Sequence, residues 1–204
     1  MENKLEYIEL NDAHLPEEII KQFDYGNNDM TEYLCDSAYK DSINGNGVTY
    51  ILVDKKDYLN KEIKFIYAYV TISAHALNFY ENGAKYYTKK IDENGNVLSS
   101  VSCIEIKMFA IEKALIHQKA DGIRNSEYYS TVFLKWFLEK LYYMSMSVIG
   151  FQMIFLRSNK EGEKLYRRLK FDNCLEHIIT YDQCSEECIP MFLTLKNLEY
   201  YLYD

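Results

Sequence analysis

The stretch from Val148 to Phe171 constrains the fold of this chain more than any other. It reads VIGFQMIFLRS and then NKEGEKLYRRLKF: an apolar run of strand length, a turn and a short helix. An apolar run with so little polar relief is typical of a strand that is covered on both faces. Ser158 and Asn159 can cap a helix where the run stops. We therefore predict a strand–turn–helix unit that begins at Val148.

Tyr166 is a candidate functional residue of this unit. Leu165 and Leu169 lie one helical turn apart on the same helix, so Tyr166 can point toward the carboxyl end of the strand. Ligands of α/β folds usually bind at that edge of the sheet, and a phenol there can donate a proton. The alternative is a packed core tyrosine with a satisfied hydroxyl group, which stays open in a chain with twenty tyrosines.

Composition limits the classes of protein to consider. A chain of 204 residues that is 48% hydrophobic and 26% charged is long enough for one well-packed domain. Its net charge of −8 disfavours a broad nucleic-acid-binding face, although a local basic patch around Arg157, Arg167 and Arg168 is compatible with it. No apolar run approaches a membrane span, and the first ten residues lack the regions of a signal peptide. We expect a cytoplasmic protein without a membrane segment.

The five cysteines do not predict a metal site. They are Cys35, Cys103, Cys174, Cys184 and Cys188, scattered and without a CxxC pair. A structural zinc site needs four ligands at tighter spacing. Free thiols in a reducing compartment are the expected state.

The remaining pattern predicts a mixed order of strands and helices in one domain, residues 1–204. Strands are expected at 4–10, 48–53, 63–74, 101–111, 148–156, 177–181 and 190–195, and helices at 16–23, 30–39, 128–146 and after Asn159. The NGNG sequence at 44–47 marks a turn, and 77–100 reads as a loop excursion with room for one hairpin. This order favours an α/β or α+β fold.

The stretch from Val148 to Phe171 resembles a known family. Its matching residues fall on the N-x-x-A-x-x-L-Y-x-x-x-G-F pattern of the GNAT N-acetyltransferases and are Asn159, Gly162, Leu165, Tyr166, Leu169 and Phe171. Gly162 stands where the pattern has alanine, and Lys170 stands where it has glycine. The order of elements is also similar to that of the GNAT fold. The resemblance implies a single domain with a mixed, mostly antiparallel sheet and helices on both faces.

The resemblance also implies an activity, the acyl-CoA-dependent N-acyltransferase reaction with acetyl-CoA as co-substrate. An amine attacks the thioester directly, and Tyr166 protonates the departing thiolate. The segment from Glu105 to Ile111 has the E-I-x-x-x-A-I spacing of the histone-acetyltransferase branch, in which the glutamate is the general base. An amine must lose a proton to become a nucleophile, and a carboxylate can accept that proton. The alternative for Glu105 is the outward-facing polar half of an alternating strand.

Cofactor-binding residues follow from the same resemblance. The backbone of Met108, Phe109, Ala110 and Ile111 would bind the pantetheine arm in a gap beside the strand at 148–157, and Asn159 belongs to the same set. The family's glycine-rich pyrophosphate loop is degenerate here, because HQKADGIRNSEYYST holds one glycine. Its candidates for phosphate binding are Gly122, Arg124, Asn125 and Ser126. They could equally form a solvated loop.

The N-terminal half narrows the resemblance and leaves the acceptor open. Residues 23–38, with F-x-Y-G-N-N-D-M-T-E-Y-L-x-x-x-A, look like the branch that includes toxins acetylating aminoacyl-tRNA. The acceptor is expected to be an amine on a small molecule or a protein, and tRNA is the one nucleic acid to consider. A non-catalytic binding or scaffold protein on the same fold is the alternative from another class. A homodimer is a candidate assembly.

Overall fold

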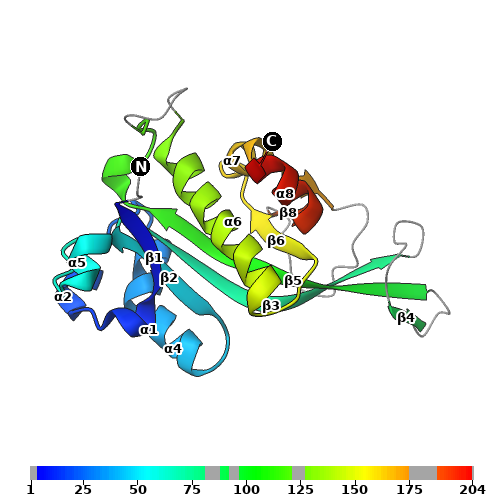
Figure 1. Ribbon diagram of the computed structural model, residues 1–204, viewed down its shortest axis with the longest axis horizontal. Helices are drawn as coiled ribbons and strands as arrows, with labels where there is room; N and C mark the ends of the chain where they lie inside the picture. Colours follow the sequence, from blue (N-terminus) through cyan, green and yellow to red (C-terminus); the bar gives the residue numbers. More distant parts are fainter. Residues whose placement is uncertain (1–3, 81–87, 92–96, 121–126, 175–187, 204) are drawn as a thin grey trace. The chain divides into compact units, whose positions relative to one another are not determined.

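Three long elements of the chain run through two compact units (Figure 1). A computed structural model describes residues 4–80, 88–91, 97–120, 127–174 and 188–203. The first unit comprises the described residues of Met1–Ser73 and Lys107–Phe137, and the second those of Ala74–Ile106 and Leu138–Asp204. The prediction of a single domain over 1–204 stays a prediction.

The first unit consists of the N-terminal elements and one end of each long element. Its elements in chain order are β1 (Leu5–Glu9), α1 (Leu10–Ala13), α2 (Glu17–Lys21), α3 (Asn28–Glu32), the π-helical turn η1 (Tyr33–Ser37), α4 (Ala38–Ile43), β2 (Val48–Asp54), α5 (Lys55–Leu59), the start of β3 (Ala68–Tyr80), the end of β5 (Val97–Ile111), the 3-10 turn η3 (Lys113–Leu115) and the start of α6 (Tyr129–Ser147). β1 pairs with β2, and β2 with β3, both antiparallel.

The helical segment from Asn28 to Ile43 confirms the helix predicted at 30–39, with one irregularity. The Asn27 side chain caps its start by accepting from the Asp29 N–H at 2.9 Å. Its middle turn is π-helical, which the spacing of apolar residues does not reveal. The predicted NGNG turn ends α4, and Gly45 adopts a φ of +72° there, a conformation that costs glycine little.

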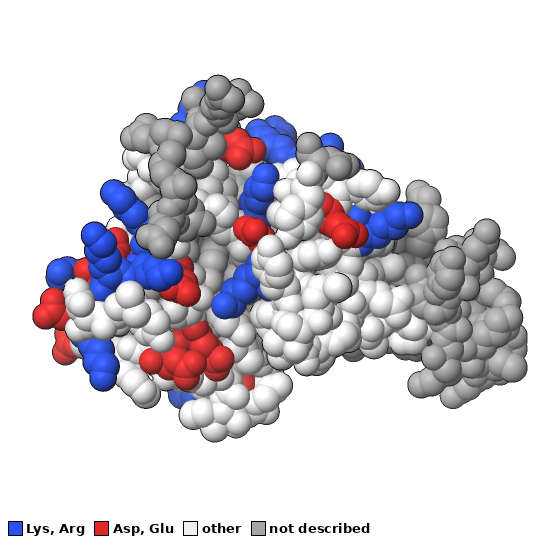
Figure 2. Space-filling model, viewed as in Figure 1, with Lys and Arg blue, Asp and Glu red and all other residues white. Residues whose placement is uncertain are grey.

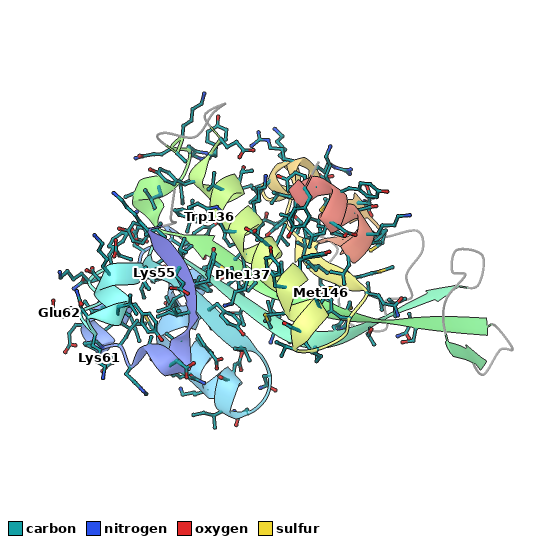
Figure 3. All side chains as sticks on the ribbon, in the orientation of Figure 1. Lys55, Lys61, Glu62, Trp136, Phe137 and Met146 are labelled. Carbon is teal, nitrogen blue, oxygen red and sulfur yellow. The ribbon has the colours of Figure 1, made fainter. Side chains whose placement is uncertain are left out.

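Aromatic side chains fill the core of the first unit and satisfy their polar atoms locally. The fully buried Tyr69 donates its hydroxyl to the Met30 carbonyl at 2.7 Å, and burial raises the pKa of this phenol. Tyr7 packs edge-on against Phe137 at 5.0 Å between ring centroids and donates to the Phe133 carbonyl. Phe137 is labelled in Figure 3. Each hydroxyl bonds a backbone oxygen, so these tyrosines are structural residues.

The second unit holds the strand–turn–helix stretch. Its elements are the end of β3, β4 (Thr88–Ile91), the start of β5, the end of α6, β6 (Met153–Ser158), α7 (Glu163–Arg168), β7 (Asp172–Asn173), β8 (Ile189–Thr194) and α8 (Leu195–Tyr203). The β4–β5 hairpin confirms the one for which residues 77–100 had room, and β3 also extends into that range.

The sheet of the second unit is mixed, as predicted. β5 and β6 form a parallel pair, with four residue pairs from Cys103–Met153 to Ile106–Leu156. β6 pairs antiparallel with β8, and β8 with β7. Buried Val101, Cys103 and Phe155 belong to a core cluster on this sheet. Burial raises the pKa of the Cys103 thiol to about 12, so the cysteine stays protonated at neutral pH.

The predicted start of β6 at Val148 is wrong. Val148 and Ile149 are 75% and 48% exposed, and their N–H groups both donate to the Met144 carbonyl at the end of α6. This apolar segment therefore finishes the helix, and the strand begins only at Met153. Figure 2 shows uncharged residues over this end of α6. Hydropathy alone could not separate the two roles, because both use the same residue types.

Other boundaries also differ from the prediction. β3 begins at Ala68 instead of residue 63 and continues past the predicted end at 74. α5 and α8 were not predicted; α8 follows directly on β8, where the Asn197 N–H donates to the Thr194 hydroxyl at 3.2 Å. The strand predicted at 177–181 lies outside the described residues. No helix within the described ranges is long and apolar enough to cross a membrane.

Candidate functional site

Tyr166 lies on α7, directly after the carboxyl end of β6. The turn between them is held by Asn159, whose side-chain oxygen accepts from the Gly162 N–H at 2.7 Å. Leu169 and Phe171 are buried and anchor the helix, and the Tyr166 ring packs edge-on against Phe171 at 5.8 Å. Tyr166 itself stays partly exposed. The predicted position of this phenol at a strand end is therefore confirmed, and its role as an acid stays a prediction.

Gly162 sets the space beside the Tyr166 ring. A Cβ at this position would lie 3.0 Å from Tyr166 Cε2 and 3.1 Å from both Asn159 Oδ1 and Ser158 Oγ. The first two contacts involve a packed ring and a hydrogen-bonded amide, so neither can move freely. An alanine at this position would therefore require its neighbours to move by a few tenths of an ångström.

Lys170 ends α7 in a left-handed conformation with a φ of +67°. The Lys170 N–H donates to the Arg167 carbonyl at 3.1 Å, and the Phe171 N–H to the Tyr166 carbonyl at 3.0 Å. This pair of bonds is the Schellman motif, in which the left-handed residue is usually glycine. The family pattern has glycine here, so Lys170 keeps the geometry without the residue that adopts it at least cost.

Glu105 is buried in the second unit, with 8% of the residue exposed. Arg157 on β6 donates to Glu105 Oε1, and His75 Nδ1 on β3 lies 3.8 Å from Glu105 Oε2. The alternative of an outward-facing strand residue is therefore wrong. Because an ion pair and a histidine engage its two oxygens, Glu105 belongs to a cluster of charged side chains.

His75 and Arg157 complete this cluster around one aromatic ring. The His75 imidazole stacks on Phe155 at 5.4 Å with an interplanar angle of 11°, and the Arg157 guanidinium carbon lies 5.2 Å from the centroid of the same ring. Sequence reasoning missed His75, because the predicted strand stopped one residue before it. The available signal was that Ser73, His75 and Leu77 share one face if the strand continues past residue 74. We call Glu105, His75, Arg157 and Phe155 the Glu105 cluster.

The predicted cofactor-binding residues fall in three places. Met108, Phe109, Ala110 and Ile111 lie on the end of β5 that belongs to the first unit, where Ala110 and Ile111 are buried. Gly122, Arg124, Asn125 and Ser126 lie outside the described residues. Asn159 holds the turn before α7, as described above. Within the described part of the chain, no group of three or more His, Cys, Asp or Glu residues could hold a metal ion.

A basic surface adjoins Tyr166. Residues 160–170 contain five lysines and arginines against two glutamates, a surplus of three positive charges in a chain of net charge −8. Lys164, Arg167, Arg168 and Lys170 are all exposed, and Arg167 pairs with Glu163 at 2.7 Å. Arg167 and Lys170 also line a pocket of about 450 Å³ together with Tyr200 and Tyr201 of α8. Arg157 belongs to the Glu105 cluster, so only Arg167 and Arg168 of the predicted patch lie on this surface.

Comparisons with known proteins place the whole chain in one fold. No family model matches the sequence, and no curated protein matches it. Among solved structures, a tyrosine-to-phenylalanine mutant of the AtaT toxin, bound to acetyl-CoA and to the C-terminus of the antitoxin AtaR, is 16% identical. It has a TM-score of 0.66, over 99% of this chain and 100% of that one.

Two further toxin structures give the same result. AtaT complexed with acetyl-methionyl-tRNAfMet is 15% identical with a TM-score of 0.65, over 97% and 99% of the two chains. A tyrosine-to-phenylalanine mutant of KacT is 16% identical with a TM-score of 0.64, over 98% and 99%. This chain has the fold of these toxins. The match confirms, at the level of the fold, the resemblance to the toxin-like branch of the GNAT N-acetyltransferases.

Proposed function

We propose that this chain is an acetyl-CoA-dependent N-acetyltransferase whose acceptor is the amino group of an aminoacyl-tRNA. The observation that carries the proposal is Tyr166, a partly exposed phenol on α7 after the carboxyl end of β6. The chain has, over nearly its whole length, the fold of a toxin that has been solved with acetyl-CoA. The asparagine turn and the buried Leu169 and Phe171 hold α7 in place, so the phenol is preorganised.

The residues present can serve both ends of the reaction. When the amine nitrogen bonds the thioester carbonyl carbon, the carbon–sulphur bond breaks and the sulphur leaves with negative charge. Tyr166 donates its hydroxyl proton to that sulphur. The nitrogen gives up a proton in the same reaction, and the Glu105 cluster provides groups that can receive it. The products are the N-acetylated acceptor and free thiol, and Tyr166 regains its proton from solvent.

The basic surface beside Tyr166 supports a tRNA acceptor. Lys164, Arg168 and Lys170 can bind phosphates, and Tyr200 and Tyr201 at the adjoining pocket can stack on bases. AtaT, which has the same fold, has been solved with an acetylated aminoacyl-tRNA. A small free amine would not need this concentration of positive charge. Because AtaT is also solved with its antitoxin, a protein partner of that kind is a second proposal.

The first experiment measures acetyl-CoA binding. Acetyl-CoA at about 100 times its dissociation constant should stabilise the native state by about 2.7 kcal/mol in thermal unfolding. Radiolabelled acetyl-CoA should then label aminoacylated tRNA and leave uncharged tRNA unlabelled. Absence of acetyl-CoA binding in calorimetry would favour the non-catalytic scaffold. Binding with labelling of a small amine but not of aminoacyl-tRNA would keep the activity and overturn the acceptor.

A charge variant tests the acceptor more sharply. Replacing Lys164, Arg168 and Lys170 with glutamine should weaken tRNA binding. The slope of the logarithm of the binding constant against the logarithm of the salt concentration should become shallower by up to about one unit for each lost phosphate contact. Acetylation of a small amine should be unchanged. The matched control replaces Lys55, Lys56 and Lys64, three exposed lysines of the first unit, with glutamine. An equal loss of tRNA binding in both variants would indicate non-specific attraction.

A further inference from the structure

We propose that His75 is the general base of this reaction and that Glu105 is the residue that positions it. This inference rests on the proposed function and adds a residue to it. The reaction needs a group that can take a proton from the acceptor amine. Both Glu105 and His75 lie in the Glu105 cluster, and the geometry distinguishes between them.

The two oxygens of Glu105 are already engaged. Arg157 donates to Oε1, and His75 faces Oε2, while only 11% of the Glu105 side chain is exposed. A base must come within hydrogen-bond reach of the amine, directly or through one water. An amine that approached this carboxylate would meet a mostly buried group that is already paired with Arg157. Glu105 is therefore better placed to hold His75 than to meet the substrate.

The imidazole of His75 is held in one orientation. Its face stacks on Phe155, and its Nδ1 points at the Glu105 carboxylate. In this proposal the proton lies on Nδ1, on the side of the carboxylate 3.8 Å away, and Nε2 keeps its lone pair. The His75 side chain is 29% exposed, more than twice the fraction of Glu105. Nε2 is thus the proton acceptor that the cluster offers to a substrate.

The charged neighbours of His75 form a pair without net charge. Glu105 of β5 lies 3.8 Å from His75 Nδ1 and is itself paired with Arg157 of β6. Cys103, two residues from Glu105, is a protonated thiol at neutral pH, because burial raises its pKa to about 12.

Strand β6 connects the Glu105 cluster to the turn that leads to Tyr166. Glu105 pairs with Phe155 in the parallel ladder. Phe155 lies three residues before Ser158, the last residue of β6. At about 3.3 Å per residue, the ring that supports His75 is roughly 10 Å along the strand from the turn that leads to Tyr166. Both side chains extend several ångströms from the backbone. One substrate could therefore contact the base and the acid at neighbouring atoms.

Protons balance in this scheme. The amine nitrogen forms its bond to the carbonyl carbon, and its proton moves to His75 Nε2. The carbon–sulphur bond breaks as Tyr166 donates its proton to the sulphur. His75 then releases a proton to solvent, and Tyr166 takes one up. No oxidant, reductant or further reactant is needed.

The test compares variants by turnover and by pH profile. His75→Gln should lower kcat/KM for acetyl transfer about 10²- to 10⁴-fold at neutral pH, with acetyl-CoA affinity within about twofold of the unmutated protein. The deficit should shrink at high pH, where solvent deprotonates the amine. Free imidazole should restore part of the activity of His75→Ala. The matched control is His14→Gln, an exposed histidine of the first unit, which should have full activity.

The outcomes separate this inference from the function on which it rests. Full turnover in His75→Gln, beside loss of turnover in Glu105→Gln, would overturn the inference and make Glu105 the base. Absence of transfer by the unmutated protein would overturn the proposed function and the inference with it.

A measurement on the unmutated protein avoids any dependence on variant folding or on activity. Long-range ¹H–¹⁵N correlation spectra should show the His75 proton on Nδ1 at neutral pH. A proton on Nε2 would overturn the inference.

Discussion

Two glutamates, one on β5 and one directly after its last residue, are equally buried and differently held. Glu105 and Glu112 are each 8% exposed, seven residues apart. Glu112, in the first unit, accepts from the backbone N–H of Asp24 at 3.1 Å. Glu105, in the second unit, is held by the side chain of Arg157 and faces the imidazole of His75. Burial alone would rank the two residues together.

The difference lies in what each carboxylate controls. A carboxylate that bonds a backbone amide fixes the path of a loop, here at Asp24. A carboxylate among side chains can fix their orientation and their protonation state. The tyrosines divide in the same way: Tyr69 donates to a backbone carbonyl inside the first unit, whereas Tyr166 is partly exposed at a strand end.

Tyr166→Phe should give the largest effect. Loss of the proposed acid should lower turnover about 10²- to 10⁴-fold and change the free energy of unfolding little. Its counterpart, Tyr69→Phe, leaves the Met30 carbonyl without its 2.7 Å donor. That variant should lose about 1–3 kcal/mol of stability and keep its turnover per folded molecule. Steady-state acetyl transfer beside denaturant unfolding measures both. Full activity in Tyr166→Phe would remove the phenol from the mechanism.

Glu105→Gln and Glu112→Gln form the second pair. Glu105→Gln should alter the acidic limb of the pH–rate profile and leave acetyl-CoA affinity unchanged, because it removes the charge that faces His75. Glu112→Gln keeps an oxygen that can accept from Asp24, so its pH profile should match that of the unmutated protein. Profiles measured between about pH 5 and 9 decide this. Identical profiles for all three proteins would leave the two glutamates without a functional difference.

Gly162→Ala should give a smaller effect that is confined to the second unit. The added Cβ meets the Tyr166 ring at 3.0 Å, so the ring or the Asn159 turn must shift. We expect turnover to fall by up to about tenfold, since a displacement of 1 Å can cost about a hundredfold and this one is smaller. The control is Gly150→Ala, where a Cβ meets nothing within 4 Å. An equal response of both variants would show that the crowding at Gly162 has no consequence for Tyr166.

Lys170→Gly should give the smallest change, in the opposite direction. Glycine relieves the left-handed conformation and should raise stability by about 1 kcal/mol, or roughly 2–4 °C in Tm for a chain of this size. Lys164→Gly is the control, because glycine inside α7 should cost about 1 kcal/mol. Acetylation of a small amine should be unaffected in both. Destabilisation by Lys170→Gly would mean that the lysine side chain contributes more than its backbone conformation costs.

Local patterns predicted those parts of the molecule that depend on neighbouring residues. The helix with Tyr166, its start after Asn159 and the strand at 101–111 all follow from residues a few positions apart. The partners of Glu105 come from elsewhere, because Arg157 is 52 residues away in the sequence. Nothing local indicates that these side chains meet. The predicted strand start at Val148 was wrong for another reason, because apolar residues that end a helix look like the start of a strand.

Helix α7 also has a consequence for the order in which substitutions can accumulate. Position 162 cannot gain a carbon without moving a ring, and position 170 would benefit from losing its side chain. The two positions hold, respectively, a smaller and a larger residue than the family pattern. A lineage that first acquired glycine at 170 would have a stability reserve of about 1 kcal/mol. Alanine at 162 would then be tolerated, whereas the reverse order passes through a less stable intermediate.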